Sequence, residues 1–235
     1  MHTLPKKEFK VILKTRKPRK RLILKEVELF DMDLTGIDLS NIDFSFSAFH
    51  RVRFDGANLE FSSVCNALFD KCTAHNTDFS HANLECAVLR YADMTYCNIE
   101  GANLYGAVLE HAKLDGIVSN EGTRWFRLHC PEKGAFIGYK KCFNGNYCLV
   151  QLLIPADAKR TSATLPSCRC NKAKVLTIKS FDYKEIYKEA WSLIDENFVY
   201  RVGEWVEVKD FDDDRWNDST TGIHFWMTIE EAKNY

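Results

Sequence analysis

The sequence predicts a mainly β protein in which a solenoid is followed by an α+β domain. Three observations lead to this fold class. Large apolar residues recur every five positions between residues 27 and 117, a spacing that fits neither an α-helix nor a flat strand. The same stretch contains no proline, as an uninterrupted hydrogen-bond ladder prefers. From about residue 118 the five-residue spacing stops and strand-like runs begin.

The five-residue repeat has a large residue at its centre and usually a small residue two positions earlier. Eighteen consecutive units keep this register, and among their centres only Ala74 is small. The position just before the centre is often Asp or Asn. Repetition at a fixed short period is typical of stacked architectures, in which each unit buries its apolar side chain against its neighbours. The centres are Leu29, Leu34, Leu39, Phe44, Phe49, Phe54, Leu59, Val64, Phe69, Ala74, Phe79, Leu84, Leu89, Met94, Ile99, Leu104, Leu109 and Leu114.

The segments "GANLEF", "HANLEC", "YADMTY" and "GANLYG" resemble the unit of pentapeptide-repeat proteins. This resemblance covers about residues 27–117. It implies a right-handed, four-sided (quadrilateral) β-helix with one pentapeptide per side and about 4.5 coils. Residues twenty apart should then stack, so we expect Phe49, Phe69, Leu89 and Leu109 to form one buried ladder. Cys72 and Cys97 occupy the small inward position, which predicts buried thiols.

Both ends of a solenoid need covering, because the terminal strands would otherwise expose unpaired backbone groups. We interpret residues 1–26 as a basic cap formed by a β-hairpin, with strands in "FKVIL" and "RLILKEVEL". The loop between them could contact nucleic acid or another anionic partner, but we favour a solvated turn that complements the acidic solenoid. Its basic residues are Lys14, Arg16, Lys17, Arg19, Lys20 and Arg21.

Residues 118–235 are expected to form the α+β domain. A helix is predicted from Tyr183, where apolar residues recur at helical spacing, and a shorter one after Thr228, where Glu231 completes a capping box. Strands are predicted in "AFIGYKKC", "YCLVQLLIP", "AKVLTI", "FVYRVGEWVEV" and "GIHFWMTI".

The same domain is similar to an uncharacterised domain that follows pentapeptide repeats in many bacteriophage and some bacterial proteins. The segments "LLIPADAKRTSA" and "CRCNKAKVLTI" are among those that carry the resemblance. It implies a phage-type origin and brings no established activity.

Charge is distributed unevenly along the chain. Residues 1–26 have ten Lys/Arg and two Glu, a net charge of +8, whereas residues 27–117 have five Lys/Arg and fourteen Asp/Glu, a net charge of -9. The remaining residues carry seventeen of each sign. No apolar run has the length of a membrane span, and no signal-peptide pattern is present. Nine cysteines without an export signal favour reduced thiols in a cytoplasm.

The acidic solenoid, about as wide as duplex DNA, underlies our main functional hypothesis. Some pentapeptide-repeat proteins bind topoisomerases by resembling DNA in shape and charge, and such rods are commonly dimeric. The resemblance thus implies a host protein as partner, with a DNA-binding enzyme and a homodimer as options. We expect a non-enzymatic interaction protein of the host bacterial cytoplasm, without a cofactor, that modulates or inhibits its partner. The candidate acidic residues are Asp55, Glu60, Asp78, Asp93 and Glu100.

A second hypothesis is a site for a phosphorylated small molecule or for nucleic acid. The basic segment 159–179 contains no acidic residue, and arginine forks with hydroxyl groups are suited to phosphate. The alternative, which we favour, is a basic face that packs against the solenoid or the acidic turn at 210–218. The candidate ligands of the anion are Lys159, Arg160, Arg169, Lys172 and Lys174.

A third hypothesis is an enzyme. "YRVGEW" and "GIHFWMTIEEAKNY" are loosely similar to strands of ADP-ribosyltransferase-like folds, which would make Arg201, His224 and Glu230 or Glu231 the residues to test. We favour a structural core histidine at position 224.

No metal site is expected. Cys168 and Cys170 are spaced too closely for a zinc knuckle. The turn at 210–218 has Arg215 where a calcium loop needs glycine, so we interpret it as a solvated acidic turn.

Overall fold

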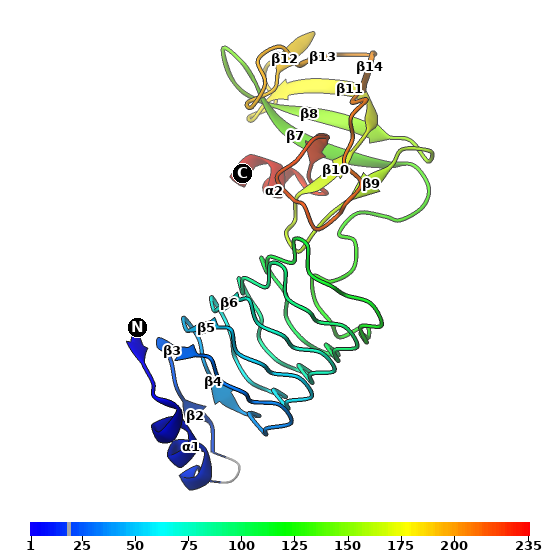
Figure 1. The fold of residues 1–235 in the computed structure, drawn as a ribbon. Coiled ribbons are helices and arrows are strands. Elements are labelled where there is room, and N and C mark those ends of the chain that lie inside the picture. Colours follow the sequence, from blue (N-terminus) through cyan, green and yellow to red (C-terminus); the bar gives the residue numbers. More distant parts are fainter. Residues whose placement is uncertain (18–19) are drawn as a thin grey trace. The chain divides into compact units, whose positions relative to one another are not determined.

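The structure, a computed structural model, describes residues 1–17 and 20–235. It divides into two compact units, Met1–Arg127 and Leu128–Tyr235 (Figure 1). The division falls later than residue 118, because Val118 and Arg124 still form backbone bridges with Asn98 and Asn103 of the preceding coil. In the described part of the chain, no helix has the length and apolar character needed to cross a membrane.

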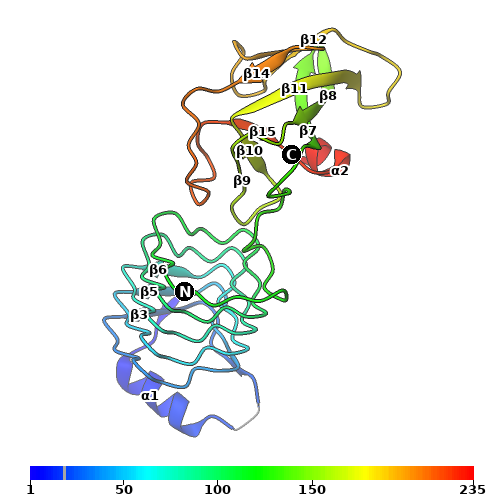
Figure 2. The same cartoon turned by 90° about the vertical axis from the view of Figure 1, so that its right-hand side faces the viewer.

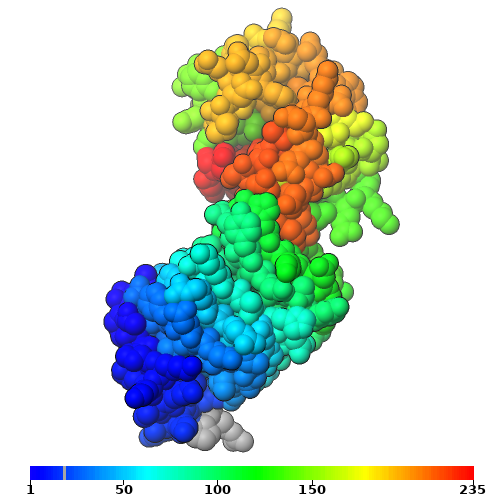
Figure 3. All heavy atoms as spheres, viewed as in Figure 1, coloured from blue at the N-terminus to red at the C-terminus, as the bar shows by residue number. Residues whose placement is uncertain are grey.

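The first unit is the predicted four-sided β-helix, whose coils lie one on another (Figures 1 and 2). Parallel bridges join residues twenty positions apart, as in the series Asp38, Asn58, Asp78 and Asn98. The side chains of this unit are closely packed on the side visible in Figure 3. Its longer paired segments are β3 (Val27–Phe30), β4 (Ile42–Asp43), β5 (Ala48–His50) and β6 (Leu68–Asp70).

The interior of the β-helix contains the predicted ladder. Phe49, Phe69, Leu89 and Leu109 are all buried, and the rings of Phe49 and Phe69 are 4.9 Å apart between centroids. The small inward positions include Cys72 and Cys97, as predicted. Burial raises the pKa of both thiols to about 12, so they are protonated packing groups at neutral pH.

The corners of the β-helix require left-handed backbone two residues after each centre. Phe61 and His81 adopt this conformation at successive coils, and Gly101 follows with φ +67°. A Cβ atom on Gly101 would lie 2.4 Å from Nδ1 of His81. The absence of a side chain at Gly101 therefore lets the imidazole ring of His81 lie over this corner.

The predicted N-terminal hairpin is wrong. After β1 (His2–Thr3), residues Lys6–Thr15 form helix α1, which lies at the N-terminal end of the coil stack in Figures 1 and 2. A helix places Phe9 on one side and Val11 on the other, so that Phe9 is fully buried 6.3 Å from the ring of Phe44 while Val11 is 59% exposed. The helical cap thus closes the open end of the interior, which an isolated strand would not do.

The second predicted strand of that hairpin joins the ladder instead. β2 (Leu22–Ile23) pairs in parallel with β4, and β3 pairs in parallel with β5. Part of the predicted basic loop, including Arg19, lies outside the described residues.

The second unit consists of two antiparallel sheets and a terminal helix (Figures 1 and 2). The larger sheet has the strand order β13-β12-β7-β8-β11-β14, and the smaller one β15-β10-β9. In chain order, the strands are β7 (Phe136–Asn144), β8 (Asn146–Ile154), β9 (Arg160–Thr161), β10 (Cys168–Cys170), β11 (Lys172–Ser180), β12 (Glu189–Trp191), β13 (Val199–Arg201), β14 (Trp205–Glu207) and β15 (Ile223–Phe225).

One apolar core contains buried residues from both sheets of the second unit. Gly138 in β7 is essential to their close approach, because a Cβ atom there would lie 2.6 Å from Cδ2 of the buried Phe225 in β15. Helix α2 (Ile229–Asn234) begins with the predicted capping box, in which Thr228 and Glu231 each bond to the other's backbone N–H.

The helix predicted from Tyr183 is wrong. Asp182 instead accepts hydrogen bonds from the Ser180 hydroxyl and the Lys184 amide in a turn, and the chain returns as β12, which pairs with β7 and β13. Ala190 is buried by this pairing, whereas Ile194 of the apparent helical stripe is 83% exposed. Pairing with β7 and β13 satisfies backbone hydrogen bonds of this segment, so the side-chain periodicity does not decide its structure.

Replacing Phe9 by alanine should destabilise the first unit by about 3 kcal/mol or more, because it leaves a cavity under the cap. Urea unfolding followed by circular dichroism measures this change. Val11→Ala, on the exposed side of the same helix, is the matched control and should have little effect. Equal stability of the two variants would contradict the role assigned to α1.

Candidate functional site

One side of the β-helix has acidic residues and no Lys or Arg. Backbone bridges align four pentapeptides on this side, which we term the acidic face: residues 37–41, 57–61, 77–81 and 97–101. It has one carboxylate in each coil, and these belong to Asp38, Glu60, Asp78 and Glu100. The carboxylates alternate between the position before the centre and the position after it, so they form a staggered line along the face.

Three of these carboxylates have no cationic partner among the described residues. Arg16 forms an ion pair with Asp38 at the N-terminal end of the face. Within residues 1–17 and 20–235, no basic side chain lies within ion-pair distance of Glu60, Asp78 or Glu100. All three are partly exposed.

The other two predicted acidic residues lie on the adjacent side of the β-helix and are paired. Asp93 lies 3.2 Å from Nζ of Lys113, and Asp55 lies 3.5 Å from Nε of Arg53. The structure therefore separates the five candidates into an unpaired group on the acidic face and a neutralised pair beside it.

Asp78 also has a structural role that the sequence analysis missed. Its Oδ1 accepts a 2.8 Å hydrogen bond from the backbone N–H of Ser80, and Asn58 and Asn98 accept the same bond at the equivalent positions. The frequent Asp or Asn before the centres was the available signal, because these side chains commonly bond to the amide two residues later. Asparagine serves equally well, so the turn does not require the negative charge.

An aromatic pair lies on the acidic face. The rings of Phe61 and His81 are stacked with centroids 4.9 Å apart, and Phe61 is 47% exposed. An exposed ring beside carboxylates is a suitable contact for the apolar stem and charge of an arginine or lysine.

A pocket of about 810 Å³ lies in the second unit. Its lining comes from β7, the loop between β12 and β13, the end of β14 and the segment leading into β15. Residues from these elements include Lys140, Ile194, Phe198, Glu207, Thr220 and His224.

Among the three residues predicted as catalytic candidates, Arg201, His224 and Glu231, it is His224 that lines this pocket. Its Nε2 lies 3.4 Å from the backbone oxygen of Asp218. Burial lowers the pKa of His224, and the nearby charge of Lys140 lowers it further, so the ring is neutral at physiological pH.

The other two candidates for catalysis have structural partners elsewhere. Arg201 forms an ion pair with Glu189 across β12 and β13. Glu231 caps α2 and lies 3.1 Å from Nε2 of His129. Neither is among the residues that line the pocket.

Arg169 does not face an external anion. The side chain is 2% exposed, and its guanidinium donates four hydrogen bonds of 2.8 to 3.0 Å to backbone oxygens. The acceptors are Asp212, Asp214, Asn217 and Thr221. This guanidinium is the internal cation around which the acidic turn 210–218 folds.

The remaining basic candidates are also engaged within the unit. Arg160 donates to five backbone oxygens, among them those of Pro155 and Gly134. Lys159 and Lys172 form ion pairs at 3.0 and 2.6 Å with Asp213 and Asp157, respectively. Lys174 lies 5.9 Å from the centre of the Trp205 ring. The segment therefore does not present a cluster of unpartnered cations.

The cysteines of the second unit do not assemble a metal site among the residues that the structure describes. No group of three His, Cys, Asp or Glu side chains there is placed to hold an ion. Cys168 and Cys170 are buried in the core between the sheets. In the acidic turn, Asp212 and Asp214 accept hydrogen bonds from backbone amides two residues later.

Two family models match the sequence. The model of pentapeptide repeats (8 copies) matches residues 23–60, 49–85 and 82–118, and the model of a family of unknown function (DUF5758) matches residues 126–232. The chain thus contains a pentapeptide-repeat domain followed by a DUF5758 domain.

Solved pentapeptide-repeat structures resemble part of the chain. HetL, involved in heterocyst differentiation regulation in the cyanobacterium Nostoc sp. strain PCC 7120, is 30% identical over 44% of this chain and 49% of HetL, with a TM-score of 0.27. AT2G44920, from the Arabidopsis thaliana thylakoid lumen, is 29% identical over 43% of this chain and 70% of its own, with a TM-score of 0.29.

Trypsin-treated QnrB1, a plasmid-mediated fluoroquinolone resistance protein, is 17% identical over 53% of this chain and 72% of its own, with a TM-score of 0.23. The chain spans about half the length of HetL. No curated protein matches the sequence.

Asp78→Asn should leave the free energy of unfolding within about 0.5 kcal/mol of the natural chain, because the amide oxygen keeps the turn. Asp78→Ala should lose about 1 kcal/mol, because the Ser80 amide loses its acceptor. Chemical denaturation of both variants tests this difference. A loss in Asp78→Asn as large as that in Asp78→Ala would show that the charge itself stabilises the fold.

Arg169→Met should destabilise the second unit by about 3 kcal/mol or more, because four backbone oxygens lose a charged donor. Lys174→Met on the neighbouring strand is the control and should change stability by less than about 0.5 kcal/mol. Thermal unfolding monitored by tryptophan fluorescence compares the two. If they unfolded alike, the acidic turn would not depend on the guanidinium.

Proposed function

We propose that this chain is a non-enzymatic interaction protein that binds a basic protein surface through its acidic face. One observation supports this proposal most strongly: Glu60, Asp78 and Glu100 lie on one side of the β-helix without a described cationic partner. Unpaired surface carboxylates in a row attract a positively charged partner and orient it during association.

The spacing of the carboxylates suits a protein that normally binds a nucleic-acid backbone. Coils stack at a strand spacing of about 4.8 Å, and each coil supplies one carboxylate to the face. Along the axis of duplex DNA, each strand has one phosphate about every 3.4 Å. The acidic face is thus a regular line of negative charge that is somewhat less dense than a DNA strand, which supports a DNA-binding enzyme as the class of partner.

The expected partner, its location and the effect of binding follow from the sequence resemblance. The phage-type origin implied by the sequence resemblance makes a host bacterial protein the expected partner, in the host cytoplasm. Binding would modulate or inhibit that protein by covering its basic surface. The second unit would contribute additional contacts and so partner specificity. No cofactor is needed for this activity.

The acidic face is tested with a triple variant, Glu60→Gln, Asp78→Asn and Glu100→Gln, which removes three charges and keeps the Asp78 turn. The whole tagged chain and the variant are used to capture proteins from bacterial lysate, followed by quantitative mass spectrometry. A partner of the natural chain should be recovered at least about tenfold less well by the variant. Its capture should also weaken as salt is raised.

A second triple variant controls for net charge. Glu28→Gln, Asp70→Asn and Glu110→Gln remove the same number of charges from another side of the β-helix. This variant should retain the partner. If both variants lost it equally, net charge rather than the acidic face would govern binding, and if neither lost it, the proposed binding surface would be wrong.

A further inference from the structure

Lys140 lies on the inward side of a core strand. In β7 the buried residues alternate, so that Gly138, Lys140 and Cys142 share the side facing the core. The Lys140 side chain is 7% exposed, and it lines the pocket of the second unit. A lysine at such a position is unusual, because burying an ammonium group is costly unless a partner compensates for its charge.

No partner of that kind is present among the described residues. The Lys140 side chain forms no ion pair and no hydrogen bond there, and the centroid of the Trp226 ring lies 6.0 Å from its Nζ. Lys141, its neighbour in sequence, is different, since its Nζ donates to the backbone oxygens of Lys233 and Tyr235. Burial accordingly lowers the pKa of Lys140.

The pocket around Lys140 has the character of a small-molecule site. Its volume of about 810 Å³ is within the usual range for ligand pockets. Phe198 and Tyr200 supply apolar surface, while Thr220 and the neutral His224 supply polar groups. The acidic residues of the lining, Asp195, Glu207 and Asp210, are exposed, and none of them lies within ion-pair distance of Lys140.

We propose that this pocket binds a small organic anion and that the Lys140 ammonium supplies its counter-charge. The anionic group would lie at Lys140 and His224, and the body of the ligand would contact Phe198 and Tyr200. A carboxylate or phosphate there would compensate the charge of the buried Lys140 side chain. Because Lys140 is almost fully buried and lines the pocket, the ligand is a small molecule rather than a nucleic-acid strand or a protein surface.

Reductive trapping tests whether small anions reach and recognise this amine. Glyoxylate is both an aldehyde and an anion, and glycolaldehyde is an uncharged aldehyde of similar size. With either reagent, the lysine nitrogen attacks the aldehyde carbon and one water molecule leaves. Cyanoborohydride then delivers hydride to the imine carbon while the nitrogen takes up a proton. The intact chain is labelled, and peptide mapping then measures the rate of labelling at each lysine.

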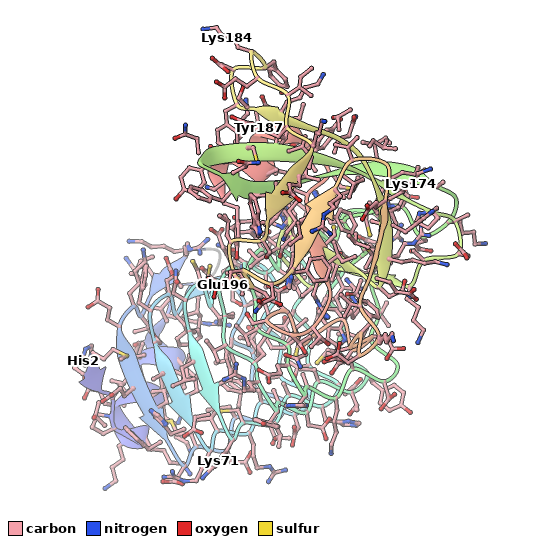
Figure 4. All side chains as sticks on the ribbon, turned by 90° about the horizontal axis from the view of Figure 1, so that it is seen from above. His2, Lys71, Lys174, Lys184, Tyr187 and Glu196 are labelled. Carbon is pink, nitrogen blue, oxygen red and sulfur yellow. The ribbon has the colours of Figure 1, made fainter. Side chains whose placement is uncertain are left out.

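The ratio of the glyoxylate rate to the glycolaldehyde rate at Lys140 should exceed the ratio at exposed lysines by about tenfold or more. Lys71 and Lys184, which both project from the surface in Figure 4, serve as internal references. Equal ratios would show that the pocket does not recognise the negative charge, and absence of labelling at Lys140 would show that it is closed to small anions. Either result overturns the proposal.

A binding measurement that involves no covalent step provides a second test. The melting temperature of the natural chain is measured in inorganic phosphate, in pyruvate and in sodium chloride at equal ionic strength. At least one of the first two anions should raise it above the value in sodium chloride. Lys140→Met should abolish that rise, and Lys140→Arg should retain part of it. An unchanged rise in Lys140→Met, or none in the natural chain, would contradict the assignment.

Discussion

The parallel backbone ladder that joins each residue to the one twenty positions later is the constraint on which the first unit depends. It holds the centre residues from Leu29 to Leu109 inside and turns most of the residues beside them outward. Each outward column therefore consists of residues twenty apart, whatever their chemistry. The Phe61 and His81 stack and the line of carboxylates both result from this register, and neither would exist in a coil of different length.

This register also shows which acidic residues the fold itself requires. On the acidic face, a side-chain oxygen just before the centre accepts a hydrogen bond from the turn, and Asn58 and Asn98 provide it as well as Asp78 does. The negative charge at position 78 is thus not a demand of the backbone. Because Glu60 and Glu100 likewise have no described ionic partner, the acidic face carries charge that the fold could do without and that a binding partner can use.

Two inward-facing cations in the second unit illustrate opposite solutions to the cost of burial. Arg169 is satisfied by four backbone oxygens, and in return it organises the turn 210–218 next to the pocket. Lys140 has a comparable burial and no such acceptors among the described residues. Since a buried charge without compensation is costly, the first cation is explained by the fold alone, whereas the second implies a ligand.

The sequence by itself determined the β-helix, because eighteen pentapeptides in register leave one arrangement that buries their large residues. It also determined the long strands of the second unit and the capping box of α2, whose signals are local. Tertiary structure decided the rest. The spacing in "FKVIL" suits a strand or a helix, and the open end of the interior selects the helix that buries Phe9. The backbone acceptors of Arg169, and the lack of any ionic partner for Lys140 among the described residues, depend on segments far apart in the chain, which no local pattern records.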